Sequence, residues 1–100
     1  MKILAIEKEV SGVDWSTVSR EILTQEALDV YRLYLNEKLR EHYFNEEKSA
    51  VLVLECETKA EAQVLLGKLP LVANNLITFE IMELRPYTGY DRIIHPVAQQ

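Results

Sequence analysis

The sequence predicts an α+β fold in which two helices cover one face of a four-stranded antiparallel sheet. Three observations indicate this fold. Strand-like and helix-like stretches follow one another in the order β-α-β-β-α-β, the second helix has a clear start signal, and one strand contains five consecutive aliphatic residues. The 100 residues correspond to one domain, and 48% apolar residues is an ordinary share for a globular chain.

A strand and a helix come first. Aliphatic residues recur at intervals over residues 2–10, and the turn pair at residues 11–12 ends this strand. Thr24 is the predicted N-cap of a helix that runs to about Leu35, because apolar residues follow it at helical spacing. Asn36 stands where a left-handed residue is expected at the C-terminus of this helix.

A hairpin and a second helix follow. Residues 39–44 and 50–57 are predicted strands, and the polar residues 45–48 form a tight connection between them. Thr58 and Glu61 have the spacing of a capping box at the start of the second helix. In that motif the threonine hydroxyl accepts from the Glu61 N–H, and the Glu61 carboxylate accepts from the Thr58 N–H.

Gly67 and Pro70 are predicted to end the second helix, because glycine adopts positive φ readily and proline cannot continue a helix. Residues 76–84 form the last predicted strand. This order of elements is the ferredoxin-like split βαβ pattern. Its right-handed crossovers place both helices on one face of the sheet and make the first and third strands central.

The aliphatic run at residues 50–54 raises the question of what covers the second face of the sheet. Successive side chains of a strand point to opposite faces, so Val51 and Val53 lie on one face of the sheet, and Leu52 and Leu54 lie on the other. The helices can cover one of these sets. An uncovered apolar sheet face is larger than a monomer usually exposes. We therefore expect a homodimer, a dimeric α+β barrel with a cavity at the seam.

Composition argues against several classes of function. The 16 acidic and 11 basic residues give a net charge of -5, and without a basic run the chain does not fit a nucleic-acid partner. We expect no membrane span, since no apolar stretch approaches the roughly eighteen residues required, and no signal peptide. The single Cys56 excludes an internal disulfide and fits a cytoplasmic location. We expect no metal site and no cofactor.

Two segments carry a resemblance to a known family. Leu69–Leu71 reads LPL directly after the second helix, and the last strand ends in Leu84–Pro86. In these segments, and in element order from about Lys2 to Pro86, the chain resembles the muconolactone isomerase family. The resemblance implies a dimeric barrel fold, a tendency to form larger homo-oligomers, and cofactor-free chemistry on a small unsaturated lactone.

The chain also departs from that family. The enzymes carry a Trp-Arg-x-x-Gly-like pattern around the end of the second strand, where residues 43–47 of this chain have neither that arginine nor that glycine. The first strand has Leu4 where the enzymes tend to have a histidine. The resemblance therefore supplies a fold and a family, but no catalytic residue is carried over.

The candidate catalytic residues lie on three strands. Proton transfer next to a lactone carbonyl requires a base, a donor for the enolate, and a cation for a substrate carboxylate. Arg40 and His42 alternate onto one face as an anion clamp beside an acid/base, and Tyr43 points to the other face. Glu55 ends the aliphatic run, where burial would raise its pKa, and Glu7 can share a proton with it. Solvated edge residues and salt bridges are the alternative interpretation.

Residues 1–86 form the predicted domain, and residues 87–100 form a C-terminal tail. The tail is richer in aromatic and aliphatic residues than a disordered terminus. We expect it to cross onto the partner subunit and rim its cavity. The candidate substrate-binding residues of this region are Arg85, Tyr87, Tyr90 and Arg92. A flexible end beyond about Asp91 is the alternative.

Two functions from different classes fit this sequence. The first is a cofactor-independent isomerase that acts by proton transfer on a small unsaturated lactone or related acid. The second is a non-catalytic dimeric protein that binds a small organic ligand, which the missing arginine and glycine favour.

Overall fold

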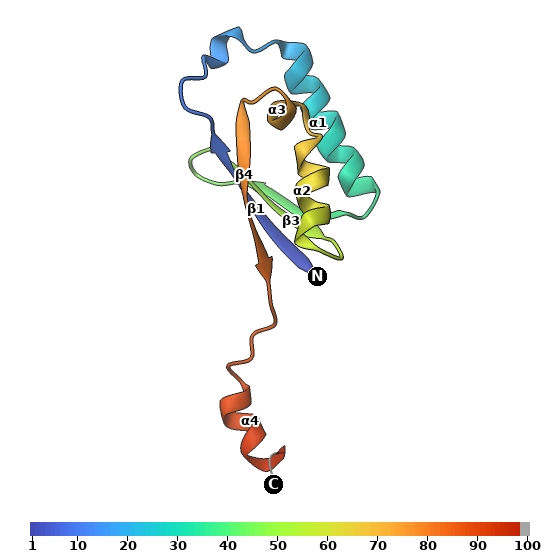
Figure 1. The fold of residues 1–100 in the computed structure, drawn as a ribbon, viewed down its shortest axis with the longest axis vertical. Coiled ribbons are helices and arrows are strands. Elements are labelled where there is room, and N and C mark those ends of the chain that lie inside the picture. The colour runs from blue at the N-terminus through green and yellow to red at the C-terminus, as the bar shows by residue number, and fades with distance from the viewer. Residues whose placement is uncertain (99–100) are drawn as a thin grey trace.

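The computed structural model describes residues 1–98, with side chains through Ile94, so the last two residues of the predicted tail lie outside the described residues. The main elements follow the predicted order (Figure 1). Their bounds are β1 Lys2–Glu9, the 3-10 helix η1 Trp15–Thr17, α1 Arg20–Leu35, β2 Leu39–Phe44, β3 Ala50–Glu55, α2 Lys59–Gly67, α3 Pro70–Ala73, β4 Ile77–Leu84 and α4 Asp91–Ala98. Within the described part of the chain, no helix combines the length and apolar composition that crossing a bilayer requires.

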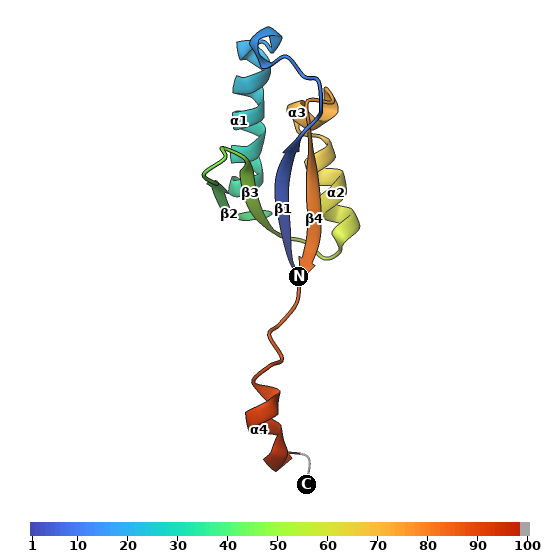
Figure 2. The ribbon, with the colours of Figure 1, turned by 90° about the vertical axis from the view of Figure 1, so that its left-hand side faces the viewer.

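The four strands form one antiparallel sheet in the order β2-β3-β1-β4. The first and third strands are therefore central, as predicted. The helices α1, α2 and α3 lie on the same side of the sheet (Figure 1), and a view turned by 90° about the vertical axis shows the strands in front of them (Figure 2). The prediction of an α+β, ferredoxin-like fold is confirmed.

The core lies between the sheet and the helices. Ile3 pairs with Leu54, and Ala5 pairs with Leu52, so these four buried side chains share the helix-facing side of the sheet. The other buried members of this cluster are Leu39, Cys56, Ala62, Leu66 and Leu69. Half of the aliphatic run thus lies under the helices, as predicted.

The opposite face of the sheet is also apolar at its centre. The apolar side chains that lie there half-buried are Leu4, Ile6, Val51, Val53 and Met82. Charged residues stand at its margin, where Lys8 and Glu80 approach to 3.8 Å. This face, hereafter the open face, is the one that Figure 2 presents.

Helix α1 begins earlier than predicted. Ser19 is its N-cap, and the Ser19 hydroxyl accepts from the Ile22 N–H at 3.2 Å. The prediction that Thr24 caps the helix was wrong, because the exposed polar residues Ser19, Arg20 and Glu21 at the start of the helix interrupt the apolar spacing on which that prediction depended.

The C-terminus of α1 is a Schellman motif. Lys38 donates to the Leu33 carbonyl at 3.0 Å, and Glu37 donates to the Tyr34 carbonyl at 3.1 Å. Glu37 has φ 64°, whereas Asn36 is the C-cap with φ -85°. The left-handed residue is therefore one position later than predicted.

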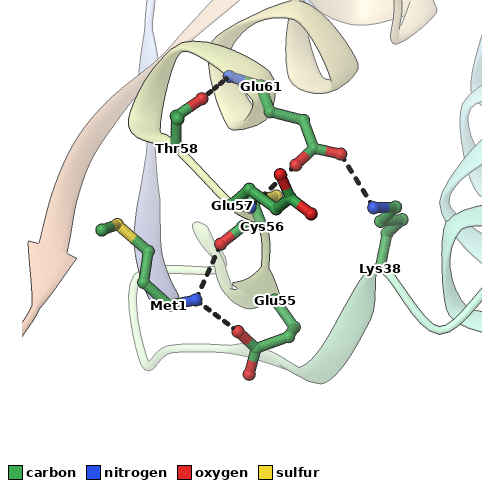
Figure 3. A network of polar contacts seen from close by, with 7 residues as sticks. All are labelled: Met1, Lys38, Glu55, Cys56, Glu57, Thr58 and Glu61. Carbon is green, nitrogen blue, oxygen red and sulfur yellow. Dashed lines mark hydrogen bonds and ion pairs between the residues drawn. The ribbon is translucent and has the colours of Figure 1, made fainter.

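The start of α2 combines a capping box with an ion pair (Figure 3). The Thr58 hydroxyl accepts from the Glu61 N–H at 3.1 Å, as predicted. The Glu61 carboxylate accepts from the Glu57 N–H at 2.9 Å, one residue before the predicted donor, and pairs with Lys38 at 2.8 Å. The Lys38 ammonium and the Glu57 N–H lower the pKa of Glu61, and Glu61 raises the pKa of Lys38.

Pro70 begins a helix instead of ending one. α2 ends at Gly67 without positive φ, and Pro70 occupies the first turn of α3, where its missing N–H leaves no hydrogen bond unmade. Leu69 is extended, as is usual for a residue before proline. The prediction for Pro70 was wrong because a second short helix starts directly after α2.

The C-terminal tail leaves the domain. After β4 the chain ends in α4, which lies away from the sheet and the other helices in both views (Figures 1 and 2). The radius of gyration is 17.3 Å, against about 13 Å for a compact chain of this length. Ile93 and Ile94 are 75% and 62% exposed, and the rings of Tyr87 and Tyr90 meet edge to face. The tail therefore presents apolar surface that its own domain does not cover.

Candidate functional site

A cavity of about 640 Å³ lies between α1 and the helix-facing side of the sheet. Small-molecule sites typically have volumes of about 300–1,000 Å³. The apolar and aromatic residues that line the cavity are Leu23, Ala27, Val30, Tyr31, Tyr34, Tyr43, Phe44, Ala50, Leu52, Leu71, Ile77 and Phe79. Two carboxylates and an imidazole complete the lining, those of Glu7, Glu26 and His42.

The cavity exists because α1 does not pack fully onto the sheet. No side chain of Arg20–Leu35 is completely buried, although Leu23, Ala27 and Val30 form an apolar stripe at helical spacing. Val30 and Leu33 pack against the core in the second half of the helix. The apolar stripe of the first half therefore faces the cavity.

Glu26 projects from that stripe and is half-buried. Its carboxylate accepts from the Leu71 N–H at 2.9 Å, one of the N–H groups that the first turn of α3 leaves without a helical partner. Burial raises the pKa of Glu26, and the nearby charges of Asp29 and Glu7 add to this rise against the opposing effect of the hydrogen bond. The structure thus keeps a carboxyl group of raised pKa in the cavity.

Glu7 faces the same cavity from β1. Its carboxylate accepts from the Ala50 N–H at 2.9 Å, which holds it at the start of β3. The residue is half-buried. Glu7 and Glu26 therefore face the same cavity from β1 and α1, and a backbone donor holds one oxygen of each carboxylate.

His42 lies at the mouth of the cavity. It pairs with Leu52 in the β2–β3 register, so its side chain is on the helix-facing side. Its ring meets that of Tyr34 edge to face, with centroids 5.3 Å apart. Both residues are exposed, which places them at the rim and leaves the deeper positions to the carboxylates.

A β-bulge separates Arg40 from His42. The register shifts between Leu39 and Glu41, which leaves Arg40 as the extra residue of β2. The alternation of side chains between the two faces is therefore broken between Arg40 and His42. The prediction that these two residues form an anion clamp on one face was wrong. The N-terminal ammonium and, more weakly, Arg40 lower the pKa of Glu55, which belongs to the open face.

Tyr43 pairs with Val51 and points to the opposite side from His42, as predicted. Its hydroxyl donates to the Glu41 carboxylate at 3.1 Å, and this interaction raises the pKa of Tyr43. The ring is 60% exposed at the edge of the cavity.

Glu55 is not buried. Its carboxylate accepts from the Met1 ammonium at 2.6 Å (Figure 3), an ion pair that lowers its pKa. It pairs with Lys2 at the start of β1, whereas Glu7 lies near the other end of that strand. The expected rise in the pKa of Glu55 and its sharing of a proton with Glu7 were therefore wrong.

The candidate residues near the tail do not line the cavity of their own chain. Within the described part of the chain, these residues are Arg85, Tyr87, Tyr90 and Arg92. Arg85 is 82% exposed and pairs with Glu83 at 3.0 Å. Within one chain, these side chains therefore do not contact a ligand in the cavity.

Metal and thiol chemistry find no support among the described residues. No group of three or more His, Cys, Asp or Glu side chains there could hold a metal ion. Cys56 is buried, and burial raises the pKa of its thiol. A thiol in this state is a poor nucleophile at neutral pH.

Glu26 is not among the residues predicted from the sequence, although the sequence contains a signal for it. Glu26 is three residues after Leu23 and four before Val30, which places a charge inside the apolar stripe of the helix. A charged residue in such a position needs a partner or a function. The interruption of the stripe could have identified it.

No family model and no curated protein matches the sequence. Among solved structures, the fold matches 5-chloro-2-hydroxyhydroquinone dehydrochlorinase from Burkholderia phenoliruptrix AC1100, in complex with 2,5-dihydroxybenzoquinone. The TM-score is 0.61 at 15% sequence identity, over 88% of this chain and 97% of the other. At this identity the match shows the fold alone. The chain therefore shares the α+β, ferredoxin-like fold of that enzyme.

Proposed function

We propose that this protein binds a small unsaturated ring compound in the cavity and isomerises it by proton transfer without a cofactor, in the cytoplasm. The observation that carries the proposal is the half-buried Glu26, whose pKa is raised inside a cavity lined by apolar and aromatic side chains. Carboxyl groups of raised pKa are effective general bases near neutral pH.

The reaction needs one carboxyl group for both proton transfers. The Glu26 carboxylate takes a proton from a carbon next to a ring carbonyl, and the electron pair of the C–H bond moves onto the carbonyl oxygen to give an enolate. Glu26 then returns the proton to another carbon of the conjugated system, so the double bond shifts and the carboxylate is regenerated. His42 and the Tyr34 hydroxyl at the mouth donate hydrogen bonds to the enolate oxygen. The charge of Glu7 helps to keep the pKa of Glu26 high.

Two likenesses support this choice of substrate class. The chain resembles the muconolactone isomerases, which act on an unsaturated lactone. The enzyme with the matching fold is described as a dehydrochlorinase of a hydroxyhydroquinone and was solved with a dihydroxybenzoquinone. Both are small unsaturated rings, and the cavity has the volume and the lining for such a molecule.

We further propose a homodimer in which the open faces of two sheets pack together. The half-buried apolar centre of the open face supports this arrangement, since a second copy would remove it from water. Residues 1–86 are then the barrel domain. The tail crosses to the partner, where Tyr87, Tyr90 and Arg92 approach the mouth of its cavity and Ile93 is covered.

The catalytic proposal is tested by a spectrophotometric assay of the full chain with muconolactone and with hydroxylated quinones. Glu26→Gln keeps the shape of the side chain and an acceptor for the Leu71 N–H, but removes the base. We expect this variant to lose at least about 100-fold in kcat, a typical contribution of general base catalysis. Glu21→Gln, in the exposed first turn of α1, is the matched control and should retain activity. Equal activity of both variants would rule out Glu26 as the base.

The alternative is a non-catalytic protein that binds the same kind of ligand. The segment at residues 43–47, which lacks the arginine and glycine of the isomerases, favours it. Saturable binding of a ring compound to the wild-type protein, without turnover of any compound in the assay, would establish this alternative.

A further inference from the structure

We propose that the cavity selects uncharged, hydroxylated rings and excludes rings that carry a carboxylate. This selectivity rests on the proposed function and narrows its substrate class. It differs from what the family resemblance implies, because a lactone that carries a carboxylate needs a cation in its site.

The charges of the cavity lining support the proposal. Among the described residues, the lining contains the carboxylates of Glu7 and Glu26 but no lysine or arginine. His42 also lines the cavity, but its side chain lies at the exposed mouth. An anionic substituent inside the cavity therefore meets like charge and finds no fixed cation.

The hydrogen-bonding capacity of the two carboxylates points to hydroxyl groups as their partners. One oxygen of Glu26 accepts from the Leu71 N–H, and one oxygen of Glu7 accepts from the Ala50 N–H. The second oxygen of each carboxylate receives no hydrogen bond from any residue that the structure describes. A ring with two hydroxyl groups would supply donors to both.

The predicted cations of the chain lie elsewhere. Arg40 is the bulge residue of β2, and its charge acts on Glu55 of the open face. Arg85 is paired with Glu83 and is outside the cavity. Arg92 of the tail lies outside the cavity of its own chain, so the described lining keeps its acidic character.

The proposal is tested with the matched ligands catechol and 2,3-dihydroxybenzoate, which differ by one carboxylate. Their binding to the full chain is measured by isothermal titration calorimetry at neutral pH. We expect 2,3-dihydroxybenzoate to bind at least about tenfold more weakly than catechol. The repulsion energy between like charges a few ångströms apart at a partly buried site exceeds the free energy that corresponds to a tenfold change in affinity. Equal or tighter binding of the benzoate, or no binding of catechol, would overturn the proposal.

Charge-neutral variants identify the residues responsible. Glu26→Gln and Glu7→Gln should each narrow the affinity ratio of the two ligands, whereas the control Glu21→Gln should leave it unchanged. An unchanged affinity ratio in both cavity variants would overturn the assignment.

A chain shortened after Gly89 tests whether the tail contributes to the binding of 2,3-dihydroxybenzoate. Benzoate binding that depends on the tail would show a cation from the partner and contradict the proposal. Selective binding of catechol, together with no turnover of muconolactone or the hydroxylated quinones in the catalytic assay, would leave this inference intact and refute the proposed catalysis.

Discussion

The carboxylate of Glu26 accepts a hydrogen bond from the backbone N–H of Leu71, 45 residues later in the chain, at 2.9 Å. This contact connects the middle of α1 to the first turn of α3. It holds the acid in the cavity while burial keeps its pKa high. The same contact therefore serves the fold and the candidate site.

The raised pKa of Glu26 predicts a pH dependence of stability. The folded state binds this proton more tightly than the unfolded state, whose carboxyl titrates near 4.5. The contribution of Glu26 to the free energy of unfolding is therefore fully present below pH 4.5 and falls as the pH rises through the raised pKa. Urea denaturation between pH 4 and 8 should show that Glu26→Gln becomes relatively more stable than the wild type as the pH increases. A constant difference between the two proteins across this range would contradict the prediction.

Substitutions at the two candidate caps of α1 test where the helix begins. Ser19→Ala removes the acceptor of the Ile22 N–H and should lower the free energy of unfolding by about 1 kcal/mol. Thr24→Ala replaces a residue inside the helix and should be neutral or slightly stabilising. Thermal and chemical denaturation of both variants measure the difference. A larger loss for Thr24→Ala would place the start of the helix at the originally predicted position.

Glu37→Gly should stabilise the protein. Glu37 adopts φ 64° in the Schellman motif, a conformation that costs a residue with a side chain about 1 kcal/mol relative to glycine. Glycine also gains freedom in the unfolded chain, so the net increase should be smaller than that. Chemical denaturation checks the sign, with Glu46→Gly in the β2–β3 connection as a control that should not stabilise.

A charge on the open face should prevent dimerisation. Val53 lies half-buried at the centre of that face, so Val53→Glu would put a carboxylate between the two packed sheets. Sedimentation velocity should show a dimer for the wild type and a folded monomer for the variant. Val64→Glu on the exposed side of α2 is the matched control and should remain dimeric. A stable wild-type monomer at micromolar concentration would refute the proposed assembly.

The fold could be predicted from the sequence because its signals are local. The alternation of residues 50–54 placed Leu52 and Leu54 on one face, and the structure buries both under the helices. The spacing of Thr58 and Glu61 located the start of α2 within one residue. Each of these patterns depends on neighbours a few positions away in the chain.

The candidate site could not be predicted in the same way, because its residues are defined by distant partners. The bulge at Arg40 depends on how β2 pairs with β3. Glu55 forms an ion pair with the Met1 ammonium, a partner that the alternation of side chains along β3 does not indicate. Glu26 depends on a backbone N–H that Pro70 makes available by starting a new helix after α2. Of the predicted catalytic residues, Glu7 and His42 line the cavity.

The incomplete burial of α1 has a consequence for how ligand binding and folding are coupled. A helix gains most of its stability from packing its apolar stripe, and part of that stripe in the first half of α1 faces the cavity, while the Glu26 hydrogen bond and the Ser19 cap help to hold the helix in place. A ring compound in the cavity would contact Leu23 and Ala27 and thereby supply the missing packing. Ligand binding and the local stability of α1 would then be coupled, so amide exchange along this helix should slow when a ligand binds.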